Sequence, residues 1–177
     1  MATSTPSLAG PPHIPLPYRA WFMYIDPVLS VMGVYGCFFD PSLILSSYIP
    51  TTIPNPSSLK PGGGSVSNPA AVANPAHHLV FAEMGGFFLL TIVLSTFLLR
   101  YTRDLVVWKL YQGAISIVDV VILVATYQAY VDQGRLNPFT TWRPEDWFSV
   151  LVTGACAVLR IAFVLGIGVT EGKLKTR

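Results

Sequence analysis

Charged residues are scarce in this chain, and its start lacks the features of a cleavable signal. Of 177 residues only 11% are Asp, Glu, Lys or Arg, against about 25% in a soluble domain. Hydrophobic residues make up 52%, and the mean hydropathy is +0.54. These values exclude a soluble globular domain and indicate an integral membrane protein. Because residues 1–17 contain no apolar run of the signal-peptide type, we expect a disordered tail there and insertion through the first membrane helix.

Several function classes lack their sequence features. The net charge is only +2 and no basic cluster is interleaved with aromatic residues, so no nucleic-acid partner is expected. The two cysteines, Cys37 and Cys156, both lie in apolar segments, which argues against disulfides and zinc. His77 and His78 precede Glu83, but no third ligand follows at helical spacing, so no metal site is expected. The glycine-rich run PGGGS at 61–65 is not followed by the Lys-Ser/Thr of a phosphate-binding loop. No cofactor is expected.

Four apolar segments are long enough to cross a bilayer, which takes about 20 residues as a helix. They are predicted at 18–39, 79–99, 105–130 and 147–169. Aromatic residues such as Trp21 gather at several of their ends, as in the interfacial belts of membrane proteins. Short second and third connections favour antiparallel neighbours. The sequence therefore predicts an all-α fold, an antiparallel bundle of four transmembrane helices in one domain, 18–169.

The first connection, 40–78, is long and rich in Pro, Gly and Ser. This composition leaves too little apolar surface to form a packed core. We therefore expect a flexible loop with neither helix nor strand. A short tail is expected at 170–177.

The distribution of Lys and Arg predicts the orientation, because cytosolic segments carry an excess of both. With four spans, the two termini and the second connection share one side of the membrane. Seven basic residues fall on that side: Arg19, Arg100, Arg103, Lys109, Lys173, Lys175 and Arg177. Three fall on the other side: Lys60, Arg135 and Arg143. Both termini are therefore expected in the cytosol, and the first connection in the lumen of an endomembrane.

The last five residues, KLKTR, resemble the dilysine retrieval signal of endoplasmic reticulum proteins. Lys173 and Lys175 stand five and three places from the end. This signal works only from a cytosolic tail, which the charge distribution predicts independently. The alternative is an ordinary basic tail. On the first interpretation the protein resides in the endoplasmic reticulum.

Each predicted span contains one principal ionisable residue: Asp26, Glu83, Asp119 and Arg160. Such residues cost roughly 2.5–3.5 kcal/mol at mid-membrane and are normally paired or functional. With a rise of about 1.5 Å per residue, Asp26 and Arg160 lie at nearly the same depth. Asp119 lies about a turn beyond them, and Glu83 lies near the lumenal boundary. Pro27 removes a helical amide beside Asp26, so a kink is predicted there.

Small and polar residues align with three of these ionisable residues at helical spacing. The stripes are Asp26-Ser30-Gly33-Cys37, Gln112-Ser116-Asp119-Thr126 and Ser149-Thr153-Cys156-Arg160. In a bilayer such faces contact neighbouring helices. We therefore expect Asp26, Asp119 and Arg160 inside the bundle.

Two interpretations of this polar cluster remain open, and a third is weaker. In the structural one, Arg160 pairs with Asp26, Asp119 or both and fixes the register of the bundle in a non-enzymatic scaffold or assembly factor. In the functional one, carboxylates outnumber the arginine, so one of them is neutral or available to a lipophilic, sterol- or isoprenoid-like molecule from the bilayer. A proton or ion path is less favoured, because four helices leave little room for a pore. The sequence identifies no reaction and no protein partner.

Three motifs carry a family resemblance: YIDPV in the first span, W…EDW before the fourth, and LRIAFVLG within it. Over 16–169 the chain resembles a family of small fungal four-span membrane proteins of unknown function. The shared features stand at Asp26, Pro27, Asp119, Arg160, Phe163, Leu165 and Gly166. This resemblance implies architecture and no activity. The layout is also similar to that of the emopamil-binding (sterol isomerase) and sigma-2 receptor superfamily, from which no catalytic role is carried over.

Overall fold

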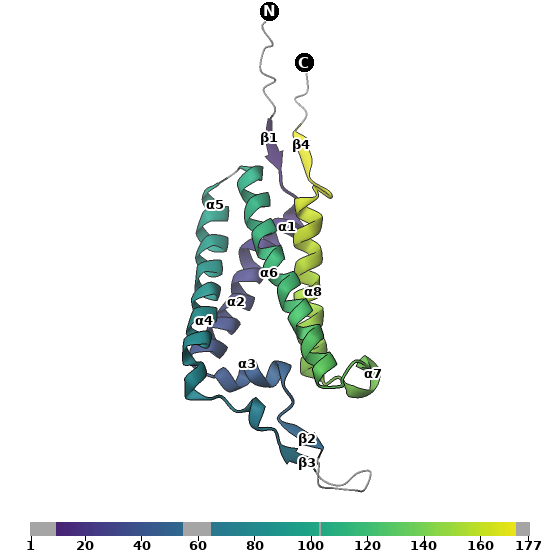
Figure 1. The fold of residues 1–177 in the computed structure, drawn as a ribbon. Coiled ribbons are helices and arrows are strands. Elements are labelled where there is room, and N and C mark those ends of the chain that lie inside the picture. Colours follow the sequence, from purple (N-terminus) through teal and green to yellow (C-terminus); the bar gives the residue numbers. More distant parts are fainter. Residues whose placement is uncertain (1–9, 55–64, 103, 173–177) are drawn as a thin grey trace, which may run out of the picture.

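Four long helices run side by side in the computed structural model, which describes residues 10–54, 65–102 and 104–172 (Figure 1). Four helical segments are long and apolar enough to cross a membrane: Leu16–Phe38, Pro75–Tyr101, Leu105–Asp132 and Pro144–Val164. The predicted all-α bundle of four spanning helices is therefore confirmed.

Two of the spans are composite helices. The first consists of α1 (Leu16–Ala20), the π-helical turn η1 (Trp21–Ile25) and α2 (Asp26–Phe38). The second consists of the 3-10 turn η3 (Pro75–His77), α4 (His78–Val93), the π-helical turn η4 (Leu94–Leu98) and α5 (Leu99–Tyr101). The other two spans are the continuous helices α6 (Leu105–Asp132) and α8 (Pro144–Val164).

The helices associate as two pairs, α2 with α4 and α6 with α8, within which the backbones approach most closely. Glycine permits this approach in the first pair, since a Cβ atom at Gly33 would lie only 2.7 Å from the Phe88 ring. Polar side chains link the pairs. The Tyr111 hydroxyl in α6 donates to the Thr91 carbonyl at 3.2 Å and lies 2.8 Å from the Ser95 hydroxyl. The bundle is thus two closely packed halves joined by polar contacts.

The buried apolar core lies at the end of the bundle that carries both ends of the described chain (Figure 1). Its buried members are Phe22, Leu99, Trp108, Tyr111 and Phe163. The Phe22 and Phe163 rings meet edge to face, with their centroids 5.3 Å apart. Along the rest of the bundle many large apolar side chains point outward. An extended apolar exterior of this kind is typical of a surface that contacts lipid.

The connection between the first two spans contains regular structure, so the prediction of a flexible loop with neither helix nor strand at 40–78 is wrong for its described part. Its elements are α3 (Pro41–Tyr48), β2 (Thr52–Pro54), β3 (Ser65–Ser67) and the 3-10 turn η2 (Pro69–Ala71). β2 and β3 pair antiparallel. The Asp40 carboxylate caps α3 by accepting from the Leu43 amide at 3.2 Å, and Pro41 suits the first helical position. Composition alone misses this start signal, because it averages over the whole connection.

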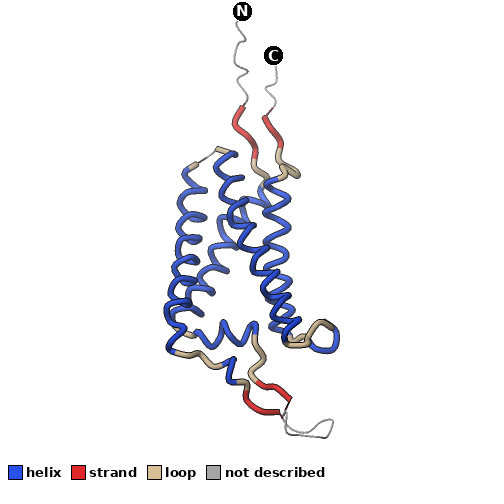
Figure 2. Tube along the Cα trace, viewed as in Figure 1, coloured by secondary structure: helices blue, strands red, loops and turns tan. Residues whose placement is uncertain are grey.

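The two ends of the described chain pair with each other. β1 (Gly10–His13) lies antiparallel to β4 (Thr170–Gly172) (Figure 2). The sequence predicts tails for both segments, but the first and last spans emerge side by side and bring them together. The predicted retrieval residues, Lys173 and Lys175, lie outside the described residues. The short helix α7 (Pro138–Thr141) lies at the opposite end of the bundle, between α6 and α8 (Figure 1).

Candidate functional site

Arg160, in the second half of α8, holds two carboxylates from two other helices. Its Nη2 atom is 2.8 Å from Oδ2 of Asp26 in α2, and its Nη1 atom binds Oδ2 of Asp119 in α6. Its Nε atom donates to Oε1 of Gln112, also in α6, at 3.2 Å. All four residues are buried, with exposed fractions between 0% and 8%. We call these four residues the intramembrane cluster.

Helical geometry explains how the chain assembles the cluster. Gln112 and Asp119 are seven residues apart in α6, which places them on one face two turns apart. Asp26 is the first residue of α2, and its amide donates to the Trp21 carbonyl across the wide turn η1. Pro27 follows and has no amide to donate. Asp26 therefore stands at the junction between two helical segments of the first span.

Two carboxylates share one guanidinium, so the cluster carries one excess negative charge when all three groups are ionised. Removing one partner of a buried ion pair is strongly destabilising, because it leaves an uncompensated charge. Each nitrogen of the Arg160 guanidinium contacts a different residue. Arg160 thereby ties α8 both to its own partner helix α6 and, through Asp26, to the other helix pair.

Two nitrogen atoms beside this cluster are buried without an acceptor in the part of the chain that the structure describes: Nε2 of Gln112 and Nε1 of Trp21. The Trp21 indole N–H points close to the Asp26 carboxylate and the Cys156 thiol, but neither contact reaches the distance and angle of a hydrogen bond. The sequence pattern predicts an interfacial position for Trp21 and a place in a polar stripe for Gln112. The sequence could not predict that these two N–H groups lack an acceptor, because this depends on how the helices pack.

The structure brings Asp26, Asp119 and Arg160 together and leaves Glu83 apart, exposed on α4. Cys37 and Cys156 are both buried and free. Among the residues at 10–54, 65–102 and 104–172, no group of three or more His, Cys, Asp or Glu side chains could hold a metal ion. The candidate site itself consists of ion pairs and a hydrogen bond.

A second buried ion cluster lies where α7 leads into α8. Asp146 is fully buried and accepts from the Arg143 amide at 2.8 Å, the Arg143 Nη2 atom at 2.9 Å and the Tyr130 hydroxyl at 3.2 Å. It also pairs with Arg135. The hydrogen bond to the Asp146 carboxylate raises the pKa of Arg143 above its ordinary value. From the sequence, Asp146 is only an acidic residue in the first turn of a helix. In the structure it is the shared acceptor of Tyr130, Arg135 and Arg143 and connects the end of α6 to the start of α8.

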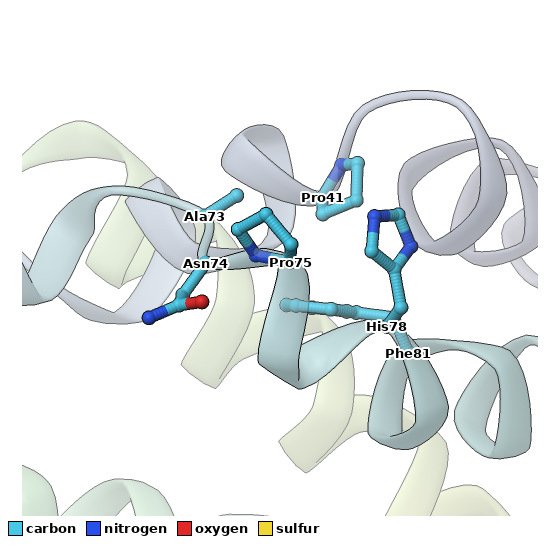
Figure 3. Close-up of a pocket in the computed structure, with 6 residues that line it drawn as sticks. All are labelled: Pro41, Ala73, Asn74, Pro75, His78 and Phe81. Atoms are coloured by element: carbon cyan, nitrogen blue, oxygen red, sulfur yellow. The ribbon is translucent and has the colours of Figure 1, made fainter.

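A small surface pocket lies between α3 and the start of α4 (Figure 3). Its lining residues are Pro41, Ala73, Asn74, Pro75, His78 and Phe81. His78 is the one ionisable group in this lining, and its imidazole lies beside Pro41 (Figure 3). The lining therefore presents one imidazole among apolar side chains and one amide.

A family model described as a domain of unknown function (DUF7704) matches residues 12–170. This range includes all four spanning helices and both ion clusters. Searches of curated proteins and of solved structures find no match to the chain.

Proposed function

The chain belongs to the family defined by the domain of unknown function DUF7704, and we propose that it binds a lipophilic molecule inside the membrane. The proposed ligand is sterol- or isoprenoid-like, and its polar group contacts the intramembrane cluster. One observation carries this proposal: Asp26 and Asp119 share a single arginine in a site that is almost fully buried. A ligand that donates a hydrogen bond to the surplus carboxylate compensates its charge, and an apolar body is compatible with the lipid around the helices.

Photoaffinity labelling tests the proposal with the full-length protein in lipid nanodiscs. The probes are a photoreactive sterol and a photoreactive farnesol analogue, each competed with its unlabelled parent. We expect competed labelling on α2, α6 or α8, reduced at least tenfold by Asp26→Asn, which keeps a polar side chain and leaves Arg160 paired with Asp119; helical circular dichroism checks that this variant is folded. The matched control is Glu83→Gln, which neutralises an exposed carboxylate in the second span. Absence of competed labelling, or equal labelling of the wild type and Asp26→Asn, would contradict the proposal.

A second candidate function is a non-enzymatic scaffold or assembly factor. One observation favours it: Arg160 engages both carboxylates and joins the two helix pairs, so the cluster already has a structural task. A triple variant with Asp26→Asn, Asp119→Asn and Arg160→Gln removes all charge but keeps polar side chains. A scaffold retains its crosslinked protein partners in this variant, whereas a lipid-binding protein loses probe labelling. Untargeted lipid profiling of a deletion strain supplies an independent comparison.

We further propose that the protein resides in the endoplasmic reticulum with both termini in the cytosol. The excess of Lys and Arg at the termini and second connection supports this orientation. The pairing of β1 with β4 is compatible with it, because both segments then lie on one side of the membrane.

A further inference from the structure

The unused nitrogen donors beside the intramembrane cluster require an acceptor. The large majority of buried side-chain polar atoms in proteins have a hydrogen-bond partner, and a buried donor without one destabilises the fold. Gln112 is fully buried, yet its Nε2 atom has no acceptor among the described residues, and the same holds for Nε1 of Trp21. Two such donors beside one ion cluster indicate that a further group binds there.

The chemistry of both donors is fixed. Oε1 of Gln112 accepts from Nε of Arg160, which cannot act as an acceptor, so the other end of the amide is the NH₂ group. The Trp21 indole has only its N–H to offer. Neither donor can therefore change its role by rotating or by exchanging a proton, and the group that binds them must present a lone pair.

The carboxylate beside Trp21 restricts the bound group further. Arg160 contacts Asp26 through Oδ2, and a carboxylate has about four acceptor sites, so Asp26 retains capacity for another donor. The surplus negative charge of the cluster favours a group that supplies this donor. A carbonyl or ether oxygen only accepts, and an ammonium only donates. A hydroxyl group does both.

We infer that the bound group is the hydroxyl of a lipophilic alcohol, which accepts from the Trp21 indole and donates to the neighbouring Asp26 carboxylate. This inference rests on the proposed function and specifies the polar group of its ligand. Water has the same hydrogen-bonding capacity as an alcohol and is the other source of this chemistry. The test must therefore separate an alcohol of the bilayer from a resident water.

Three photoreactive sterol probes that differ only at one carbon separate these sources: the alcohol, its methyl ether and the deoxy compound. Full-length protein in nanodiscs is labelled with each. We expect the alcohol to label at least tenfold more efficiently than the deoxy compound, with the ether weaker than the alcohol. In Trp21→Phe, which keeps an aromatic ring and removes the N–H, the advantage of the alcohol falls to about threefold or less. Trp147→Phe, the same change in α8, leaves the advantage as in the wild type.

The failures of the two proposals are distinguishable. If all three probes label the cluster equally, the hydroxyl inference is overturned while the lipid-binding function stands, and a water is then the acceptor. If no probe gives competed labelling, both are overturned. The indole signals of the four tryptophans, recorded by ¹⁵N NMR of the wild-type protein, give a readout that no substitution can disturb. The alcohol should shift one of them and the deoxy compound none, whereas identical spectra with both probes contradict the inference.

Discussion

Arg160 in α8 and Asp26 in α2 belong to different helix pairs, and the 2.8 Å contact between Nη2 and Oδ2 is the ion pair that joins the two halves of the bundle. The second carboxylate of Arg160, Asp119, lies within its own pair, α6 with α8. One guanidinium therefore contributes both to packing within one half and to the attachment of the other.

Replacing Arg160 by methionine should destabilise the protein strongly. The change leaves two buried carboxylates without their counterion, and breaking such a pair costs about 3–5 kcal/mol. The free energy of unfolding is measured by SDS titration in mixed micelles. Adding Asp26→Asn and Asp119→Asn to the same chain should restore at least half of the loss, because no unpaired charge remains. A single Arg160→Met variant within about 1 kcal/mol of the wild type would contradict the structural role of the cluster.

Asp146→Ala should also lower the free energy of unfolding, by about 3 kcal/mol or more. The substitution removes the shared acceptor of Arg135 and Arg143 at the start of α8. The adjacent carboxylate gives the matched control, since Glu145 occupies the same helical turn but is exposed. Glu145→Ala should change stability by less than about 1 kcal/mol. Equal effects of the two substitutions would show that the contacts of Asp146 are energetically unimportant.

Gly33→Ala should destabilise the packing of α2 against α4. The new methyl group would lie 2.7–2.9 Å from three atoms of the Phe88 ring, including its root atom Cγ, so the ring cannot simply swing away. Overpacking of this kind typically costs about 1–3 kcal/mol. Gly86→Ala in α4 is the control, because a Cβ atom there has nothing within 4 Å, and alanine raises helix propensity by up to about 1 kcal/mol. The unfolding temperatures of both variants are measured in detergent. A Gly33→Ala variant as stable as Gly86→Ala would refute the close contact between Gly33 and Phe88.

Substituting Lys173→Ser together with Lys175→Ser should redistribute a tagged protein from the endoplasmic reticulum to later compartments, if the two lysines act as a retrieval signal. Fluorescence microscopy with organelle markers measures the shift. Arg177→Ser is the control, because it removes a neighbouring positive charge without touching either lysine. Unchanged localisation of the double variant would reject retrieval by these residues.

The sequence was sufficient for the four spans, because an unbroken apolar stretch in a membrane has few alternatives to a helix. It also predicted that Asp26, Asp119 and Arg160 lie inside the bundle, since polar residues at helical spacing must avoid lipid. It left open whether Arg160 pairs with one carboxylate or with both, because the rotation and tilt of each helix decide which side chains meet.

Two local features, the cap of α3 and the partners of Asp146, were not predicted from the sequence for other reasons. The cap that Asp40 provides to α3 involves one residue in a connection dominated by Pro, Gly and Ser. The partners of Asp146 include Arg135 and Tyr130, which precede it by 11 and 16 residues and meet it only after the chain folds back through α7. Both cases depend on a specific contact that composition and periodicity do not encode.

The position of Arg160 in the last helix has a consequence for biosynthesis. Asp26 enters the membrane with the first segment to be synthesised, but its counterion is translated only with the fourth. At about 5–20 residues per second, the interval is on the order of ten seconds. During that time the Asp26 carboxylate lacks the counterion that it has in the folded protein. A chain that stalls or is truncated before α8 never forms the ion pair between Asp26 and Arg160. The presence of this pair therefore distinguishes the completed protein from its fragments.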